Sequence, residues 1–142
     1  MNASEQLPLG YLLNRIVNRL RTDVSASVLE ALGLSFPQYV CLRILEKLPG
    51  MSNADMAREI GVSPQAMNIV VRALQDRGLI ARPSTVASGR SRPTELTPAG
   101  RTLVAKTVPG VCAAEDRLFA PLSPAERAEF HRMMTLLADV TG

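Results

Sequence analysis

The first quarter of the chain carries a helical pattern of apolar positions. Apolar residues recur at steps of three and four from Leu9 to Leu32, a spacing that places them on one face of an α-helix. Gly33 follows them directly and suits a left-handed cap at a helix end. A helix of about six turns is longer than so short a chain needs for its own core. The pattern therefore predicts a long amphipathic helix that packs against a partner subunit.

Three shorter helices follow, and each begins at a serine that can cap it. They start at Ser35, Ser52 and Ser63, and the last runs to about Arg77. That last helix has an apolar stripe at i, i+3, i+4 and i+7, made of Met67, Val70, Val71 and Leu74. The opposite side must then face solvent or a ligand, and it presents Gln65, Asn68, Ile69 and Arg72.

A hairpin and two further helices complete the pattern. Short strands are predicted at 79–82 and 92–97 around a polar Gly/Ser loop, and caps at Thr97 and Ser123 open the last two helices. Pro109-Gly110 interrupts the first of these and should kink or break it. The predicted fold is mainly α (α+β), in the order of four helices, a two-stranded hairpin and two helices.

The helices on either side of residues 61–63 have the arrangement of a helix-turn-helix, whose second helix enters the major groove of duplex DNA. Ser63 and Pro64 at its N-terminus suit a phosphate, and Gln65 and Asn68 can each pair bidentately with adenine. Arg72 can reach guanine or phosphate, and Ile69 can contact a thymine methyl group. Periodicity alone fits a capped amphipathic surface helix equally well.

Charge distribution favours the DNA interpretation. The net charge is only +3, but the pI is about 9.3, and the stretch 63–101 holds six arginines against two acidic residues. Arg90 and Arg92 lie on small flexible residues in the hairpin loop, where they would fit a narrow minor groove. A solvated loop would explain these two arginines as well. The inference of DNA binding therefore rests on the order of a helix pair followed by a basic hairpin.

The composition and motifs argue against several other classes of protein. Aromatic residues make up 4% and Trp is absent, which argues against a stacking platform for single strands. The sequence has one histidine, His131, and neither a nucleophile motif, a phosphate loop nor a cluster with metal-ligand spacing, so we expect no enzyme and no cofactor. No leader or membrane span is evident, which predicts a cytoplasmic protein.

Short motifs along nearly the whole chain resemble the MarR family of multiple-antibiotic-resistance regulators. They are Leu48 to Ser52, Met56-Ala57, Val62-Ser63, Leu74 to Ile80 and Leu96 to Gly100. The resemblance implies a winged helix-turn-helix with a two-stranded wing. It also implies a homodimer held by residues 1–34 and 98–142, with residues 35–97 as the DNA-binding lobe. By that resemblance, such a dimer would act as a repressor on a pseudo-palindromic operator.

The resemblance further implies release from DNA by a small aromatic or lipophilic anion. Arg15, Tyr39 and Arg43 are candidate ligand residues, since cations and a phenolic hydroxyl suit a carboxylate. Ordinary packing would account for each of the three taken singly. Oxidation of Cys41 or Cys112 is a second possible switch, although inert packing is expected because neither has a cation beside it in the sequence.

A module that binds another protein through the same fold is the remaining alternative. Such a module should present a contiguous apolar patch, whereas the outer face of the helix at 64–77 is polar apart from Ile69.

Overall fold

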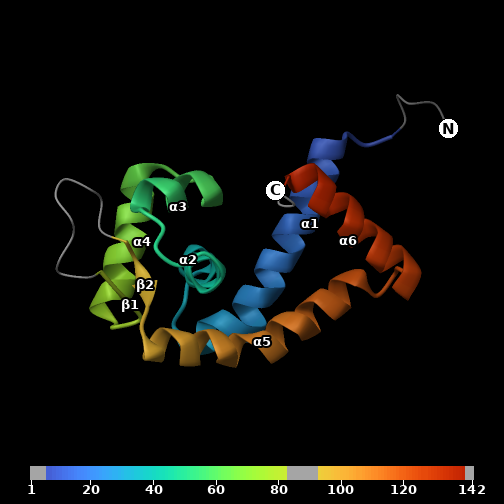
Figure 1. Ribbon diagram of the computed structural model, residues 1–142. Helices are drawn as coiled ribbons and strands as arrows, with labels where there is room; N and C mark the ends of the chain where they lie inside the picture. The colour runs from blue at the N-terminus through green and yellow to red at the C-terminus, as the bar shows by residue number, and fades with distance from the viewer. Residues whose placement is uncertain (1–5, 83–92, 140–142) are drawn as a thin grey trace.

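The computed structural model describes residues 6–82 and 93–139 (Figure 1). Its elements, in chain order, are α1 (Leu9–Val24), a π turn (Ser25–Leu29), a 3-10 turn (Glu30–Leu32), α2 (Phe36–Lys47), α3 (Asn53–Ile60), α4 (Pro64–Asp76), β1 (Ile80–Ala81), β2 (Glu95–Leu96), α5 (Pro98–Phe119) and α6 (Pro124–Ala138). The predicted order of elements is confirmed.

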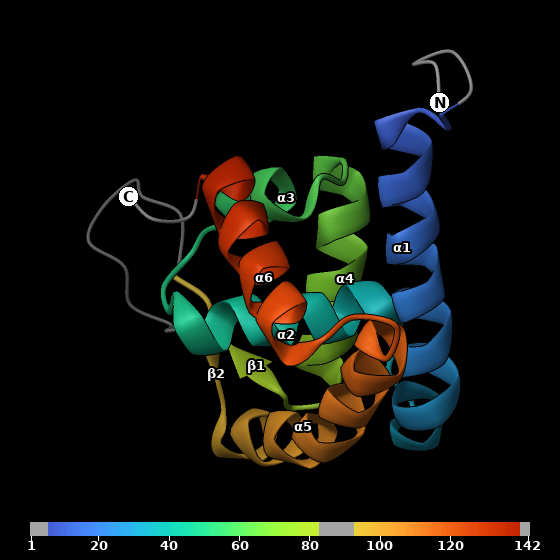
Figure 2. The same cartoon turned by 90° about the vertical axis from the view of Figure 1, so that its right-hand side faces the viewer.

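The elements form a lobe and an arm. Helices α2, α3 and α4 with the two strands make the lobe, and α1, α5 and α6 make the arm (Figure 1). Helix α5 contacts both α1 and α2, so it joins the two parts. Helix α6 folds back from the far end of α5, and it stands apart from α1 when the molecule is turned (Figure 2).

The first predicted helix is only partly α-helical. The α-helix ends at Val24, and the chain reaches Gly33 through the wider π turn and the tighter 3-10 turn. Gly33 has the expected left-handed conformation, with φ of 67°. The change occurs where Val28 meets Gly110 of α5, and a Cβ on this glycine would lie 2.5 Å from Cγ2 of Val28. Apolar periodicity shows which residues face inward, but it does not distinguish these helix types.

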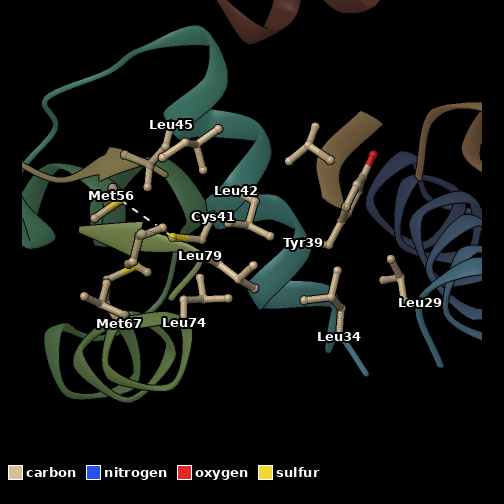
Figure 3. Close-up of a cluster of buried hydrophobic side chains, with 14 of the residues drawn as sticks. Leu29, Leu34, Tyr39, Cys41, Leu42, Leu45, Met56, Met67, Leu74 and Leu79 are labelled. Carbon is tan, nitrogen blue, oxygen red and sulfur yellow. Dashed lines mark hydrogen bonds between the residues drawn. The ribbon is translucent and has the colours of Figure 1, made fainter. Parts of the chain in front are cut away.

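The core of the lobe surrounds α2 (Figure 3). Cys41, Leu42 and Leu45 of α2 are buried among Met56 of α3 and side chains from α4, β1 and β2. The apolar stripe predicted for α4 is confirmed, because Met67, Val71 and Leu74 are fully buried, and Val70 is partly buried against the same core. Burial of this stripe fixes which side of α4 remains in solvent.

The hairpin is antiparallel, with Ile80 paired with Leu96 and Ala81 with Glu95. These strands are shorter than predicted, and the remainder of the hairpin, residues 83–92, lies outside the described residues. The sequence predicted a kink or a break at Pro109-Gly110, and the break is wrong because α5 continues through Pro109 to Phe119. Gly110, next to this proline, lies against Val28 of the π turn.

In the part of the chain described, no single helix is long and apolar enough to cross a membrane. The segments Leu9–Leu32 and Phe36–Lys47 meet the length and composition test only as a pair, across a bend of 84°.

Candidate nucleic-acid interface

Helix α4 has one face in the core and one in solvent. The Ser63 hydroxyl accepts a hydrogen bond from the Ala66 amide at 3.1 Å, and Pro64 occupies the first turn, as predicted for a capped helix. The buried stripe then orients the other side outward. All six candidate residues of this segment are exposed: Ser63, Pro64, Gln65, Asn68, Ile69 and Arg72.

A tight turn sets α4 against α3. Gly61 adopts φ of 78°, a left-handed conformation that favours glycine, and its amide and that of Val62 both donate to the Ala57 carbonyl. Ser52 caps α3 by accepting from the Asp55 amide at 3.1 Å. The two short helices therefore pack as a unit, with the N-terminus of α4 open to a ligand.

Asn68 belongs to a chain of polar contacts that sequence reasoning missed. Arg82, just after β1, donates from Nη2 to Oδ1 of Asn53. Asn53, in the first turn of α3, donates from Nδ2 to Oδ1 of Asn68 at 2.8 Å. The two hydrogen-bonded pairs are 15 and 29 positions apart in the chain, and no local pattern marks such contacts. Only the packing of α3, α4 and β1 brings them together.

These contacts form one wall of a polar hollow of about 200 Å³ beside the outer face of α4. Its lining residues are Asn53, Asn68, Val71, Arg72, Gln75 and Arg82. Nearly all of these side chains donate or accept hydrogen bonds, and two are arginines with no acidic residue among them. The hollow is therefore suited to an anionic or polar partner.

The predicted arginines of the hairpin, Arg90 and Arg92, lie outside the described residues. The base of the hairpin is described, and it lies directly beside α4 (Figure 1). Thr94 connects this base to the start of α3, because its amide donates to Met51 and its carbonyl accepts from Gly50. The base of the hairpin is thereby anchored to the loop that leads into α3.

Comparison with known proteins identifies this arrangement. Residues 34–91 match the sequence model of the MarR family. The chain is 47% identical over 137 residues to the HTH-type transcriptional repressor Rv2887 of Mycobacterium tuberculosis, covering 96% of this chain and 98% of that protein. The chain belongs to the MarR family. It is a winged helix-turn-helix protein, as its sequence predicts.

Two solved structures of that MarR-family relative superimpose on the chain. The crystal structure of Rv2887 in complex with DNA has a TM-score of 0.77 at 45% identity, and the two chains are covered to 93% and 98%. The structure of Rv2887 in complex with salicylic acid has a TM-score of 0.80 at 48% identity, with coverage of 94% of this chain and 98% of that chain.

The MarR-like motif around Thr97 fastens α5 to the end of α4. Thr97 caps α5 by accepting from the Gly100 amide, and its hydroxyl also donates to the Gly78 carbonyl at 2.6 Å. Its own amide donates to the carbonyl of Leu79. A Cβ on Gly100 would lie 2.2 Å from that same carbonyl oxygen, so only glycine fits there. The motif thus has a packing role.

Arg77 makes a second connection between α4 and the arm. Its guanidinium donates to the carbonyls of Gly33 at 2.8 Å and Leu32 at 3.1 Å, at the end of the 3-10 turn. These carbonyls have no intrahelical partners, so the arginine caps them. The C-terminus of α4 is thereby tied to the segment that leads from α1 into the lobe.

The three ligand candidates lie in different surroundings. Arg15 lines a hollow of about 580 Å³ between α1 and α5, and neither Tyr39 nor Arg43 is part of its lining. Tyr39 is buried in α2, and burial raises the pKa of its hydroxyl, while the nearby guanidinium of Arg43 opposes that rise. Arg43 also pairs with Glu46 at 2.8 Å.

The two cysteines differ in their surroundings. Cys41 is fully buried with its Sγ 3.8 Å from Sδ of Met56, and burial raises the pKa of this thiol to about 12 (Figure 3). Such a thiol stays protonated and unreactive at neutral pH, as expected. Cys112 is exposed on α5, so the expectation that it is packed away is wrong. The sequence did not show this, because Cys112 lies only two residues past Gly110, where α5 is in close contact with Val28.

Within the described residues, no group of three or more histidine, cysteine or acidic side chains is placed to hold a metal ion.

Proposed function

We propose that this MarR-family protein is a homodimeric transcriptional repressor that binds a pseudo-palindromic operator and leaves it when a small aromatic carboxylate binds. The polar outer face of α4 is the observation that carries the proposal, because α4 is the second helix of a helix-turn-helix and presents hydrogen-bonding side chains outward. A relative of 45% identity is known in complex with DNA. The proposal assigns no enzymatic activity and places the protein in the cytoplasm, where it can reach DNA.

In this proposal the contacts divide into phosphate and base contacts. Ser63 and Pro64 at the start of α4 contact a phosphate, where free amides and the helix dipole favour negative charge. Gln65, Asn68 and Arg72 reach base edges in the major groove, and Ile69, 72% exposed, contacts a thymine methyl. Arg90 and Arg92 of the hairpin grip the adjacent minor groove.

Dimerisation is supported by the apolar side chains that the arm exposes to solvent. Leu9 and Leu13 of α1 are 78% and 53% exposed, and Leu137 of α6 is 85% exposed. Helix α6 buries none of its side chains within the described part of the protomer. We propose that residues 1–34 and 98–142 form the dimer contact and that residues 35–97 form the DNA-binding lobe.

The proposed effector is a small aromatic carboxylate. The hollow between α1 and α5 is large enough for such a ligand and has Arg15 and Arg19 on its wall. Tyr39 and Arg43 of α2 are the other proposed ligand residues, although neither is part of the lining of this hollow. A 48% identical relative is known in complex with salicylic acid. By linkage, a ligand that weakens DNA binding must itself be weakened equally by DNA.

The DNA assignment is tested by selecting duplexes from a random library and measuring affinity for the selected sequence at several salt concentrations. Arg72→Ala should weaken binding by about 1–3 kcal/mol if it meets a base, or reduce the salt slope by about one if it meets a phosphate. Lys106→Ala, an exposed cation on α5, is the control and should change neither. Failure to enrich any duplex would overturn the assignment.

The effector assignment is tested by titrating salicylic acid into the complex with the selected duplex. Arg15→Ala and Tyr39→Phe should each require more ligand for release while leaving affinity for DNA unchanged, because both residues lie outside α3 and α4. Lys47→Ala, an exposed cation at the end of α2, should respond as the unmodified protein does. An unaltered response in both variants would exclude these residues from the ligand site.

A further inference from the structure

The direction of the hydrogen bonds from Arg82 through Asn53 to Asn68 is determined by chemistry. An arginine side chain has donors and no acceptor. Asn53 must therefore turn its Oδ1 toward Arg82, and in this orientation its Nδ2 donates to Oδ1 of Asn68. Asn68 can then accept only through its own Oδ1. The orientation of both amides follows from the guanidinium at one end of the chain.

The surroundings of Arg82 hold this end of the chain in place. The side chain is half-buried, and its Nε is shielded from solvent without a hydrogen-bond partner in the described residues. Because this guanidinium has lost part of its hydration, breaking its remaining hydrogen bonds would cost free energy. Asn53 is half-buried as well, whereas Asn68 is exposed at the outer face of α4.

We infer that Arg82 and Asn53 are positioning residues that turn the Asn68 amide so that only its Nδ2 donor faces the DNA. This inference rests on the proposed function. It deepens that function by replacing the expected bidentate contact with adenine, which needs both the oxygen and the nitrogen of an asparagine amide. Oδ1 of Asn68 accepts a hydrogen bond from Asn53 at 2.8 Å. The Nδ2 donor of Asn68 is then the group that faces hydrogen-bond acceptors on the DNA.

The consequence for sequence preference is specific. Guanine presents two acceptors, N7 and O6, in the major groove, whereas adenine presents one acceptor and the N6 amino donor. A donor facing that amino group makes no hydrogen bond and leaves a polar group unsatisfied. Asn68 should therefore prefer guanine to adenine, by roughly tenfold for one such difference.

The test begins by finding the base pair that Asn68 reads. Duplex selection is carried out with the full-length protein and with Asn68→Ala, and the pair whose preference disappears in the variant is the one contacted. We expect guanine at that pair for the unmodified protein. Adenine there, or no change of base preference in Asn68→Ala, would overturn the inference while leaving the DNA-binding function intact.

Asn53→Asp provides the decisive variant, because a carboxylate only accepts. It would accept from Arg82 and also from Asn68, so the Asn68 amide must turn its Nδ2 inward and its Oδ1 outward. The preference should change from guanine to a base with an amino group, adenine or cytosine, with at least a tenfold reversal of relative affinity. An acidic residue suits the first turn of α3, so the variant should fold.

Gln75→Glu is the matched control. It adds the same charge to the same polar hollow, but Gln75 is not part of the hydrogen-bond chain. Its overall affinity for DNA should fall through repulsion from phosphates, with the base preference at the Asn68 pair retained. If both acidic variants alter that preference alike, charge and not amide orientation sets it, and the inference is wrong.

A measurement without DNA separates the inference from the proposed function. In NMR spectra of the free protein, exchange of the Asn53 side-chain amide protons should be slowed, and those of Asn68 should exchange at the solvent-limited rate. In Asn53→Asp, the Asn68 protons should become the protected ones. Fast exchange at Asn68 in both proteins would show that the hydrogen-bond chain does not control this amide, whether or not any duplex is selected.

Discussion

At the residue scale, two glycines allow α5 to lie against the rest of the protomer. A Cβ at Gly110 would stand 2.5 Å from Cγ2 of Val28, and one at Gly100 would stand 2.2 Å from the Leu79 carbonyl oxygen. The valine methyl is the end of a side chain and can shift, whereas the carbonyl is held in the turn between α4 and β1. A side chain at position 100 should therefore destabilise the fold more than a side chain at position 110.

Gly100→Ala should lower the free energy of unfolding by about 1–3 kcal/mol, the usual range for forcing atoms into a packed site. Urea unfolding at fixed protomer concentration measures the change. Gly10→Ala is the control, because a Cβ on this exposed residue of α1 meets nothing within 4 Å. It should be neutral or stabilising by up to about 1 kcal/mol. Equal effects of the two substitutions would refute the packing role of Gly100.

At the element scale, α1 and α5 are joined by an ion pair between residues 94 positions apart. Arg117 donates from Nε and Nη2 to the two carboxylate oxygens of Asp23, each at 2.8 Å. The hydrogen bonds from Arg117 lower the pKa of Asp23 below its ordinary value of 3.8, and they prevail over the opposing effect of desolvation. Both side chains are partly solvated, so the pair mainly fixes the geometry of the arm.

The ion pair makes stability depend on pH in acid. Because the pKa of Asp23 is lowered on folding, its contribution is present above pH 3.8 and is lost as the pH falls through the lower folded value. Asp23→Asn should therefore be less stable than the unmodified protein at pH 7, with the difference shrinking below about pH 4. Urea unfolding between pH 7 and pH 3 checks this.

Glu129→Gln is the comparison for that measurement. Glu129 pairs with Arg132 three residues away on α6, so losing this pair disturbs one helix and no contact between helices. Its effect at pH 7 should be smaller than that of Asp23→Asn. A stability difference for Asp23→Asn that stays constant from pH 7 to pH 3 would contradict the role given to the ion pair.

At the scale of the whole molecule, the arm has more apolar surface than the protomer can cover. The large exposed hydrophobic residues concentrate on α1 and α6, including Leu9, Leu12, Met133 and Leu137. Phe130 of α6 contacts Phe119 of α5, with ring centroids 5.7 Å apart, which orients α6 without burying its apolar side. We propose that a second copy of the chain packs against this apolar surface.

Leu137→Asp should weaken the dimer, because it would place a charge in the proposed contact. We expect analytical ultracentrifugation to show monomers at concentrations where the unmodified protein is dimeric, and affinity for a full pseudo-palindrome to fall by at least tenfold. Leu48→Asp is the control, since Leu48 is 52% exposed just after α2 and outside the arm. A dimer that survives Leu137→Asp unchanged would remove Leu137 from the contact.

The pattern of residues by itself determined the order of elements and the outward face of α4. Caps such as Ser63 and the stripe from Met67 to Leu74 are local signals, because hydrogen bonding and burial along one helix depend on residues a few positions apart. The family resemblance likewise followed from short motifs, and the comparisons confirm it. These parts of the fold and of the candidate site were therefore predictable.

Tertiary structure alone decided which distant residues act together. The π turn opposite Gly110 and the unbroken course of α5 through Pro109 were not visible in the local pattern. Likewise, the orientation of the Asn68 amide depends on Asn53 and Arg82, which packing brings to it from α3 and β1. Periodicity records which way a side chain points, but a hydrogen bond between separate elements depends on the position of both, and only the folded chain sets that position.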